Sequence, residues 1–173
     1  KSPILTSVAK GDLVTVLEHL ENWTKIATAD GYIGYVRNKR LGSVTETTIS
    51  NEFTEPEYTR IKKDYTINLV WHQISNMDSN YALSSDIESM TGVNTISPTW
   101  FSVASKDGTV SSLADSSYVE TAHEKGLEVW GLVDNFNQEV DMKEVLTNTT
   151  AREKLTTQLI EAALEYQLDG LNI

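Results

Sequence analysis

The feature that most constrains this chain is a regular alternation of strand and helix patterns over residues 65–173. Apolar and β-branched runs predict four strands, near residues 65–71, 93–97, 127–133 and 168–173. Successive strands begin roughly 30 residues apart, which is the spacing of a βαβ unit, so parallel strands are expected. Such an alternation forms either a small open sheet or half of an eight-fold β/α barrel, and periodicity alone does not choose between them.

The segments between these strands carry helix and turn patterns. Three helices are expected: one near 84–90, one opened by a capping-box pattern at Ser117 and Glu120, and one opened by a second such pattern at Thr150 and Glu153. An Asp107-Gly108 pair predicts a hairpin between the second strand and the second helix.

Residues 1–45 have a different, all-β pattern. Short strands are predicted at 13–17, 23–27 and 32–36, with the turn pair Asp30-Gly31 before the last of them, which is typical of a small barrel. The polar segment 46–64 is predicted to be a linker.

Composition excludes some partners and leaves others open. The net charge of −11 argues against nucleic acid or an anionic membrane as a partner, whereas a neutral polymer such as a glycan stays compatible. The chain has no cysteine, and none of its three histidines is placed to form a metal-binding pair, so no metal or other cofactor is expected. No apolar run approaches the roughly 18 residues that span a bilayer.

A first resemblance lies in the all-β part. The pattern Lys10-Gly11-Asp12, then 22–26, then the run 30–36 with sequence DGYIGYV is similar to a bacterial SH3-like domain, a module of secreted wall-associated proteins. The resemblance implies a wall peptide or glycan as partner, and an opening strand that begins upstream of Lys1. Trp23, Tyr32 and Tyr35 are its aromatic candidates for contact with a peptide or glycan, although Trp23 and Tyr35 are expected to be mostly core in so small a barrel.

A second resemblance covers residues 65–173. The strand runs 67–71, 93–101, 127–130 and 168–173 recur in the order and spacing of the bacterial spore-cortex and cell-wall lytic branch of family 18 glycoside hydrolases. The resemblance implies that residues 65–173 are the first half, about four βα units, of a TIM (β/α)8 barrel. The family's fourth strand carries Asp-Gly-x-x-x-Asp-x-Glu, of which Asp169 and Gly170 match the first two positions, so the catalytic Glu is expected beyond residue 173.

The resemblance also implies a mechanism and a set of site residues. Family 18 enzymes are retaining: one Glu protonates the glycosidic oxygen, and the substrate's own N-acetyl group attacks the anomeric carbon. Asp169 and Asn172 are the catalytic motif positions in this chain, although Asp169 is expected to support the strand rather than touch sugar. Asn172 stands where many chitinases have Asp, and an amide cannot ionise.

Substrate-contact candidates come from the ends of the predicted strands. Active sites of β/α barrels lie at the carboxyl ends of their strands, and five candidates lie there: Trp71, Trp100, Phe101, Asp134 and Asn135. Core packing is the equal alternative for Trp100 and Phe101, as a helix cap or loop turn is for Asp134 and Asn135.

The resemblance favours a glycosidase for N-acetylglucosamine-containing polysaccharide, either peptidoglycan or chitin, that is secreted or associated with the bacterial wall or spore. A non-catalytic glycan-binding wall protein is the alternative. An unrelated doubly wound domain is disfavoured, because residues 71–76 lack a Gly-rich phosphate loop. Half a barrel leaves strand edges open, so this chain by itself is expected to be unstable, to associate, or to need further residues.

Overall fold

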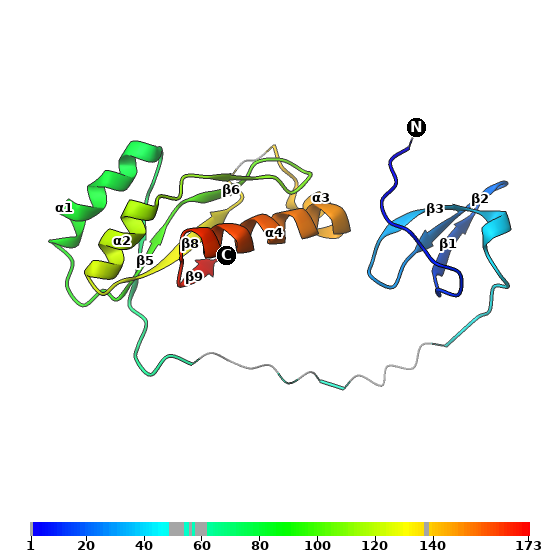
Figure 1. The fold of residues 1–173 in the computed structure, drawn as a ribbon, viewed down its shortest axis with the longest axis horizontal. Coiled ribbons are helices and arrows are strands. Elements are labelled where there is room, and N and C mark those ends of the chain that lie inside the picture. Colours follow the sequence, from blue (N-terminus) through cyan, green and yellow to red (C-terminus); the bar gives the residue numbers. More distant parts are fainter. Residues whose placement is uncertain (1, 49–53, 56, 58–61, 137–138) are drawn as a thin grey trace. The chain divides into compact units, whose positions relative to one another are not determined.

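The structure is a computed structural model that describes residues 2–48, 54–55, 57, 62–136 and 139–173. The chain divides into two compact units, Lys1–Lys62 and Lys63–Ile173 (Figure 1). The linker predicted at 46–64 stays a prediction, because residues 49–53, 56 and 58–61 lie outside the described residues. No helix in the described part of the chain is long and apolar enough to cross a membrane.

The first unit is a three-stranded antiparallel sheet in the order β1-β2-β3. Its strands are β1 (Thr15–His19), β2 (Trp23–Ala27) and β3 (Ile33–Arg37), followed by the short 3-10 helix η1 (Asn38–Arg40). The Asp30-Gly31 pair lies in the turn between β2 and β3, where Gly31 has a φ of 87°. All three predicted strands are therefore present, within two residues of their predicted starts.

The buried face of this sheet is the one opposite to Trp23. Thr24 and Ile26 are 0% and 5% exposed, whereas Trp23 and Tyr35 are 42% and 57% exposed. The expectation that Trp23 and Tyr35 are mostly core is therefore wrong. Alternation along a strand defines two faces but does not determine which of them is buried. Here the Thr24 side chain lies on the buried face, where its hydroxyl donates to Asn38 Oδ1 at 2.8 Å.

The second unit is an α/β unit with a mostly parallel sheet. Its strands are β4 (Leu69–His72), β5 (Thr95–Pro98), β6 (Phe101–Val103), β7 (Val110–Ser112), β8 (Glu128–Asp134) and β9 (Gly170–Asn172). Its helices are η2 (Met77–Ala82), α1 (Leu83–Ile87), α2 (Ser116–Glu124), α3 (Met142–Thr147) and α4 (Thr149–Glu165).

The parallel strands follow the chain in order across the sheet. β4 pairs with β5, β5 and β6 both pair with β8, and β8 pairs with β9, all in parallel. Because only Thr99 and Trp100 separate β5 from β6, the two run along the same edge of β8 as one bent strand, and β9 takes the other edge. The predicted hairpin at Asp107-Gly108 is confirmed, since β7 pairs antiparallel with β6.

Two helix starts differ from the capping boxes expected from the sequence. The residue that caps α2 is Asp115, which accepts from Tyr118 N at 3.0 Å, and the residue that caps α4 is Asn148, which accepts from Ala151 N at 3.1 Å. Ser117 and Thr150 lie inside these helices. Asp and Asn are stronger N-caps than Thr, and both adopt the extended conformation of a cap here. Helix α3 was not predicted.

The core of the second unit lies on one face of the sheet. It joins Ile96 of β5 and Val129 of β8 to buried residues of the helices, such as Tyr118 and Leu155. Gly131 of β8 fits beneath Phe101, whose Cε2 would lie 2.5 Å from a Cβ added at that glycine. The sheet and helices therefore pack closely on this side.

Candidate functional site

The carboxyl ends of the parallel strands bring several of the predicted site residues together. β4, β8 and β9 end at His72, Asp134 and Asn172, and parallel strands have their carboxyl ends at the same edge (Figure 1). The neighbours Leu171 and Val133 pack against the core, so Asn172 and Asp134 point to the opposite face.

The same alternation assigns further side chains to that face. Val70 packs against the core, Ile96 and Phe101 are part of it, and the residues that follow them along the chain therefore point away from it. We call the face defined by Trp71, Ser97, Ser102, Asp134 and Asn172 the site face. It combines the exposed ring of Trp71 with the Ser102 hydroxyl, a carboxylate and an amide, which suits a polar, uncharged ligand, while Ser97 is fully buried and is a hydrogen-bond partner of Asn172.

Hydrogen bonds hold the polar groups of the site face. Asn172 Nδ2 donates to Ser97 Oγ at 3.1 Å, across the intervening strand β8. Asp134 accepts from Ser102 Oγ at 2.8 and 2.9 Å and from Phe136 N at 3.1 Å. Asp134 and Asn172 are therefore each oriented by a side chain from a different strand.

The two tryptophans at this face, Trp71 and Trp130, differ in exposure and in contacts. Trp71 is 72% exposed, so its ring is free to meet a ligand. Trp130 lies against Gly170, where an added Cβ would approach the indole within 3.1 Å, and its Nε1 donates to Glu128 Oε2 at 3.0 Å. Trp130, Ser97 and Ser102 were missed at the sequence level, although alternation from Asp134 and Ile96 would have identified them.

Trp100 and Phe101 belong to the core. They are 2% and 0% exposed, and Trp100 Nε1 donates to Asn80 Oδ1 at 2.8 Å. Trp100 also packs edge-on against Tyr118, with ring centroids 4.9 Å apart. Of the two roles considered for them, core packing accounts for their position. Asn135, by contrast, is exposed directly after β8.

Asp169 lies at the opposite end of the sheet from Asn172. It immediately precedes β9, and its Oδ2 accepts from Val129 N at 2.8 Å, near the start of β8. His123 Nε2 of α2 lies 2.8 Å from the same oxygen. The structure brings Trp71, Asp134 and Asn172 to one end of the sheet, and it puts Asp169 at the amino end as a link between α2, β8 and β9.

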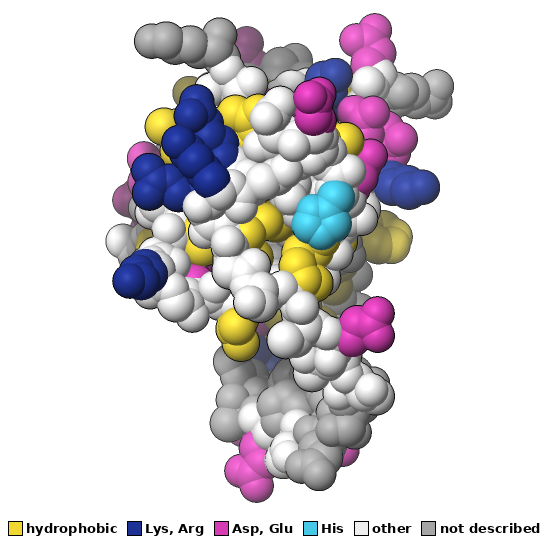
Figure 2. Space-filling model, turned by 90° about the vertical axis from the view of Figure 1, so that its right-hand side faces the viewer, with side chains coloured by type: hydrophobic (Ala, Val, Ile, Leu, Met, Phe, Trp, Pro, Cys, Tyr) yellow, Lys and Arg dark blue, Asp and Glu magenta, His cyan; other side chains and the backbone are white. Residues whose placement is uncertain are grey.

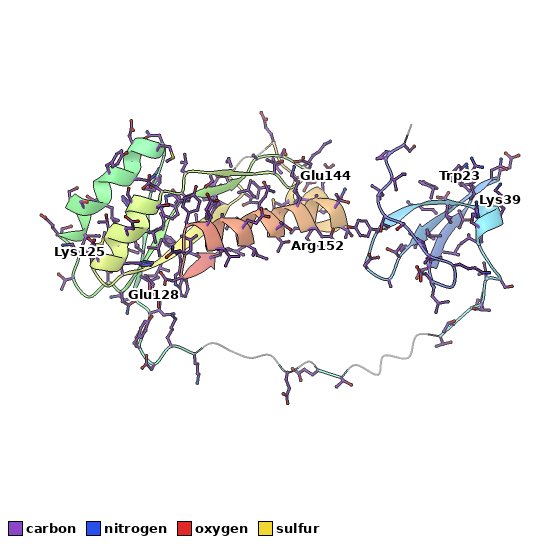
Figure 3. All side chains as sticks on the ribbon, in the orientation of Figure 1. Trp23, Lys39, Lys125, Glu128, Glu144 and Arg152 are labelled. Atoms are coloured by element: carbon purple, nitrogen blue, oxygen red, sulfur yellow. The ribbon has the colours of Figure 1, made fainter. Side chains whose placement is uncertain are left out.

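Glu128, also at the amino end, is the centre of a second polar cluster (Figure 3). Its Oε1 accepts from Lys63 Nζ and from Tyr65 OH, each at 2.5 Å. These hydrogen bonds, that of Lys63 above all, lower the pKa of Glu128, and the carboxylate raises the pKa of Lys63 and Tyr65. The cluster fastens the start of the second unit to β8.

His72 ends β4 but points to the helix side. Its Nδ1 shares a hydrogen bond with Tyr118 OH at 2.8 Å, and Asp86 Oδ2 lies 3.4 Å from its Nε2. Burial lowers the pKa of His72 and raises that of Tyr118 well above its usual range. No group of three or more His, Asp or Glu side chains in the described ranges is arranged to hold a metal ion.

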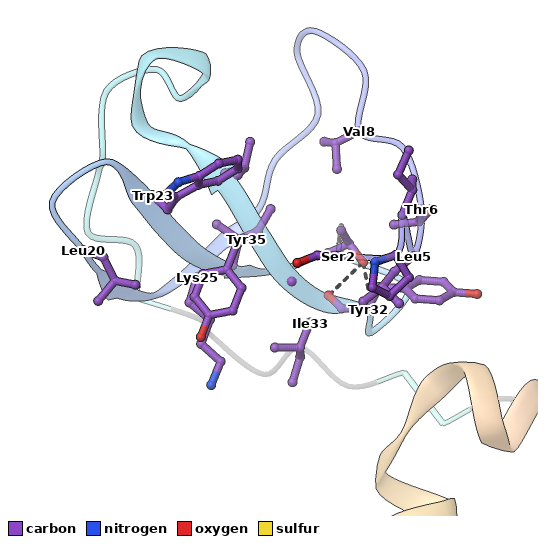
Figure 4. A pocket seen from close by; sticks show the side chains of 16 residues that line it. Ser2, Leu5, Thr6, Val8, Leu20, Trp23, Lys25, Tyr32, Ile33 and Tyr35 are labelled. Carbon is purple, nitrogen blue, oxygen red and sulfur yellow. Dashed lines mark hydrogen bonds between the residues drawn. The ribbon is translucent and has the colours of Figure 1, made fainter. Parts of the chain in front are cut away.

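The first unit contains a groove of about 1020 Å³ beside β3 (Figure 4). One wall is formed by residues 2–6 and 8, and the other by Tyr32–Val36 with side chains of β2. Trp23, Lys25 and Tyr35, all on one face of the sheet, line this groove. All three predicted aromatic candidates, Trp23, Tyr32 and Tyr35, therefore line it.

Comparisons with known proteins agree with these two units. Residues 1–42 match the bacterial SH3 domain family, so the chain begins with a bacterial SH3 domain. No curated protein matches the chain.

Solved structures similar to this chain are chitinases. They include the C-terminal domain of a predicted chitinase from Desulfitobacterium hafniense DCB-2, 21% identical with a TM-score of 0.51, over 61% of this chain and 32% of that one. A chitinase from Chromobacterium violaceum ATCC 12472 is 14% identical with a TM-score of 0.45, over 62% of this chain and 34% of its own. The chain thus has a chitinase-like α/β fold and spans about a third of the length of these proteins.

Proposed function

We propose that the parent protein is a retaining glycosidase of family 18 that acts on polysaccharides containing N-acetylglucosamine, either peptidoglycan or chitin. Residues 65–173 are, in this proposal, the first four βα units of its barrel. The observation that carries the proposal is the site face, which gathers Trp71, Asp134 and Asn172 at the carboxyl ends of strands that follow the chain in order. That end of the strands is where β/α barrels hold their substrates.

Each residue of the site face has a chemical role in this proposal. Trp71 stacks its exposed ring on a sugar. Asp134, which Ser102 orients, accepts from a sugar hydroxyl or amide, and Asn135 adds a contact beside it. The catalytic Glu follows Ile173 along the continuation of β9, and the substrate's N-acetyl group is the nucleophile. Asn172, two residues before the Asp expected in the motif, contributes a hydrogen bond near the reacting groups but no charge.

The proposal includes a location and a role for the first unit. A bacterial SH3 domain beside a chitinase-like unit supports a secreted or wall-associated protein in which residues 1–45 hold the wall, and residues 46–64 link the two. No cofactor takes part.

The test uses the intact natural protein with chitin and with peptidoglycan sacculi, and measures released reducing ends. Release from at least one polymer is expected. Trp71→Ala removes the stacking ring and is expected to lower kcat/KM about tenfold or more, mainly through KM. Tyr81→Ala, which removes an equally exposed ring on η2, is the matched control and leaves kcat/KM unchanged. Absence of release from both polymers overturns the proposal.

A second candidate is a non-catalytic glycan-binding wall protein. Asn172 favours it, because it replaces a carboxylate with a group that cannot ionise and is already bonded to Ser97. The residues that follow Ile173 in the natural protein separate the two: Asp-x-Glu supports the enzyme, and Gln or Leu in place of Glu supports the binder. A binder retains the polymer without releasing reducing ends.

A further inference from the structure

The strand β3 has a free edge with unpaired backbone groups. Thr28 N donates to Tyr32 O and Asn38 N donates to Asn22 O, so the hydrogen-bonded positions of β3 towards β2 are the even-numbered ones. The N–H groups of Ile33, Tyr35 and Arg37 therefore point away from β2. No backbone hydrogen bond among the described residues reaches these three N–H groups from outside the sheet.

The groove of the first unit runs along this edge. Its lining includes the five consecutive residues Tyr32–Val36, which alternate between the two faces of the sheet, so the groove follows the edge of β3 and also extends over the face that carries Trp23 and Lys25. Residues 2–6 and 8 form the far wall, and Leu5 Cδ1 would lie 3.8 Å from a Cβ added at Gly34. None of the residues of β1, at the other edge of the sheet, lines the groove. The space therefore fits an added strand at β3 specifically.

The side chains near this edge favour a negatively charged ligand. Arg37 lies 5.3 Å above the Trp23 ring and, like Lys25, takes part in none of the ion pairs found among the described residues. Residues 1–42 have six Lys or Arg and four Asp or Glu, a net +2 within a chain of net −11. On the face of the molecule that Figure 2 shows, Lys and Arg side chains (dark blue) lie beside apolar ones (yellow). The free cations are thus complementary to an acidic ligand.

We propose that an extended acidic peptide binds in this groove as a fourth strand, antiparallel or parallel to β3, with the N–H groups of Ile33, Tyr35 and Arg37 donating to its carbonyls and Arg37 holding one of its carboxylates. Strand addition of this kind obtains affinity from the main chain and specificity from alternate side chains. The inference rests on the wall-holding role proposed for the first unit and names its ligand class as peptide rather than glycan.

The experiment uses the full chain, labelled with ¹⁵N, and a capped peptide of about seven residues in which Val and Glu alternate, long enough to cover the edge. Peptide binding is expected to slow amide exchange at Ile33, Tyr35 and Arg37 about tenfold or more, as for amides that gain a protected hydrogen bond. The amides of Gly34 and Val36, already bonded to β2, are expected to change little. This alternating pattern distinguishes strand addition from contact with one face of the sheet.

Two controls separate the contribution of backbone hydrogen bonds to peptide affinity from the contribution of charge. The same peptide with an N-methyl group on every residue has no backbone N–H to donate and is sterically blocked at both edges, so its binding is expected to be lost. Arg37→Gln is expected to weaken binding about three- to tenfold and to reduce its salt dependence, because one charge pair is removed. Lys10→Gln, at an exposed lysine outside the groove, is the matched control and leaves the affinity unchanged.

The outcomes distinguish the two proposals. Undiminished binding of the N-methylated peptide, or exchange protection elsewhere in the chain, overturns strand addition. If the chain does not bind the peptides but is retained by sacculi, strand addition is overturned and the wall-holding role is supported. If the chain neither binds the peptides nor is retained by sacculi, strand addition and the wall-holding role are both overturned.

Discussion

At the scale of single residues, Asn172 and Asp169, which the sequence predicts to be catalytic motif positions, have different surroundings. Asn172 lies on the site face at the carboxyl end of β9, where its amide meets Ser97. Asp169, three positions earlier, accepts a hydrogen bond from Val129 N near the start of β8 and is hydrogen-bonded to His123 on α2. The Asp169 carboxylate accepts a hydrogen bond from the backbone of a strand and so contributes to folding. It lies at the end of the sheet opposite to the site face.

Asp169→Ala is therefore expected to destabilise the second unit and to leave chemistry intact. The substitution leaves the N–H of Val129 without its acceptor, which costs about 1–3 kcal/mol. Thermal unfolding of the full chain measures this cost, with Glu161→Ala at an exposed position of α4 as the control. In the natural protein, a kcat that falls more than stability explains would contradict this assignment of Asp169.

At the scale of elements, His72 joins β4 to α1 and α2. Burial lowers its pKa from the ordinary value of 6.5, and the Asp86 carboxylate opposes this shift in part. The unfolded chain therefore binds a proton at His72 at a higher pH than the folded chain does. Stability contributed by the neutral imidazole is complete above the unfolded pKa and decreases as the pH falls below 6.5.

The free energy of unfolding is thus expected to fall between about pH 7 and pH 5, and to fall less in His72→Gln, because glutamine does not titrate. Urea unfolding followed by helical circular dichroism measures this, since α-helices in the described part of the chain lie only in the second unit. His19→Gln, in the first unit, is the control and keeps the slope of the parent chain. Equal slopes for His72→Gln and the parent would contradict the role of His72.

The sequence predicts the strands better than it predicts the helix starts or the buried face of β2. Every predicted strand is present, because each one carries its own apolar run and turn residues. Helix starts were misplaced by two residues, because Asp115 and Asn148 compete with the capping boxes that follow them. Which face of β2 is buried depends on contacts with Asn38 and His19 across the sheet, so the exposure of Trp23 could not be predicted from alternation alone.

The site face was predicted in part for a similar reason. Asp134 was found from its place at a strand end and Asn172 from the family motif, and their convergence follows from parallel pairing through β8. Trp100 and Phe101 also follow a strand, but the chain bends there and β6 continues beside β8, which turns both rings into the core. Such a bend depends on tertiary pairing rather than on local pattern.

At the scale of the whole molecule, the second unit leaves apolar surface and the outer edges of the parallel strands β4 and β9 uncovered by the described residues. β9 pairs only with β8, and Ile173 beyond it is 93% exposed. Ile160 and Leu164, one turn apart on α4, are 53% and 75% exposed. An open parallel edge next to exposed apolar side chains is a template for pairing with another chain.

The chain of residues 1–173 is therefore expected to associate in solution in a concentration-dependent way. Ile173→Lys puts a charge beside the β9 edge and is expected to raise the concentration needed for association about tenfold, because desolvating an unpaired ammonium opposes pairing. Ile4→Lys, at a residue 90% exposed in the first unit, is the matched control. Light scattering across a dilution series gives the result, and a monodisperse monomer that melts cooperatively would show that the edge and the apolar face of α4 are tolerated in water without a partner.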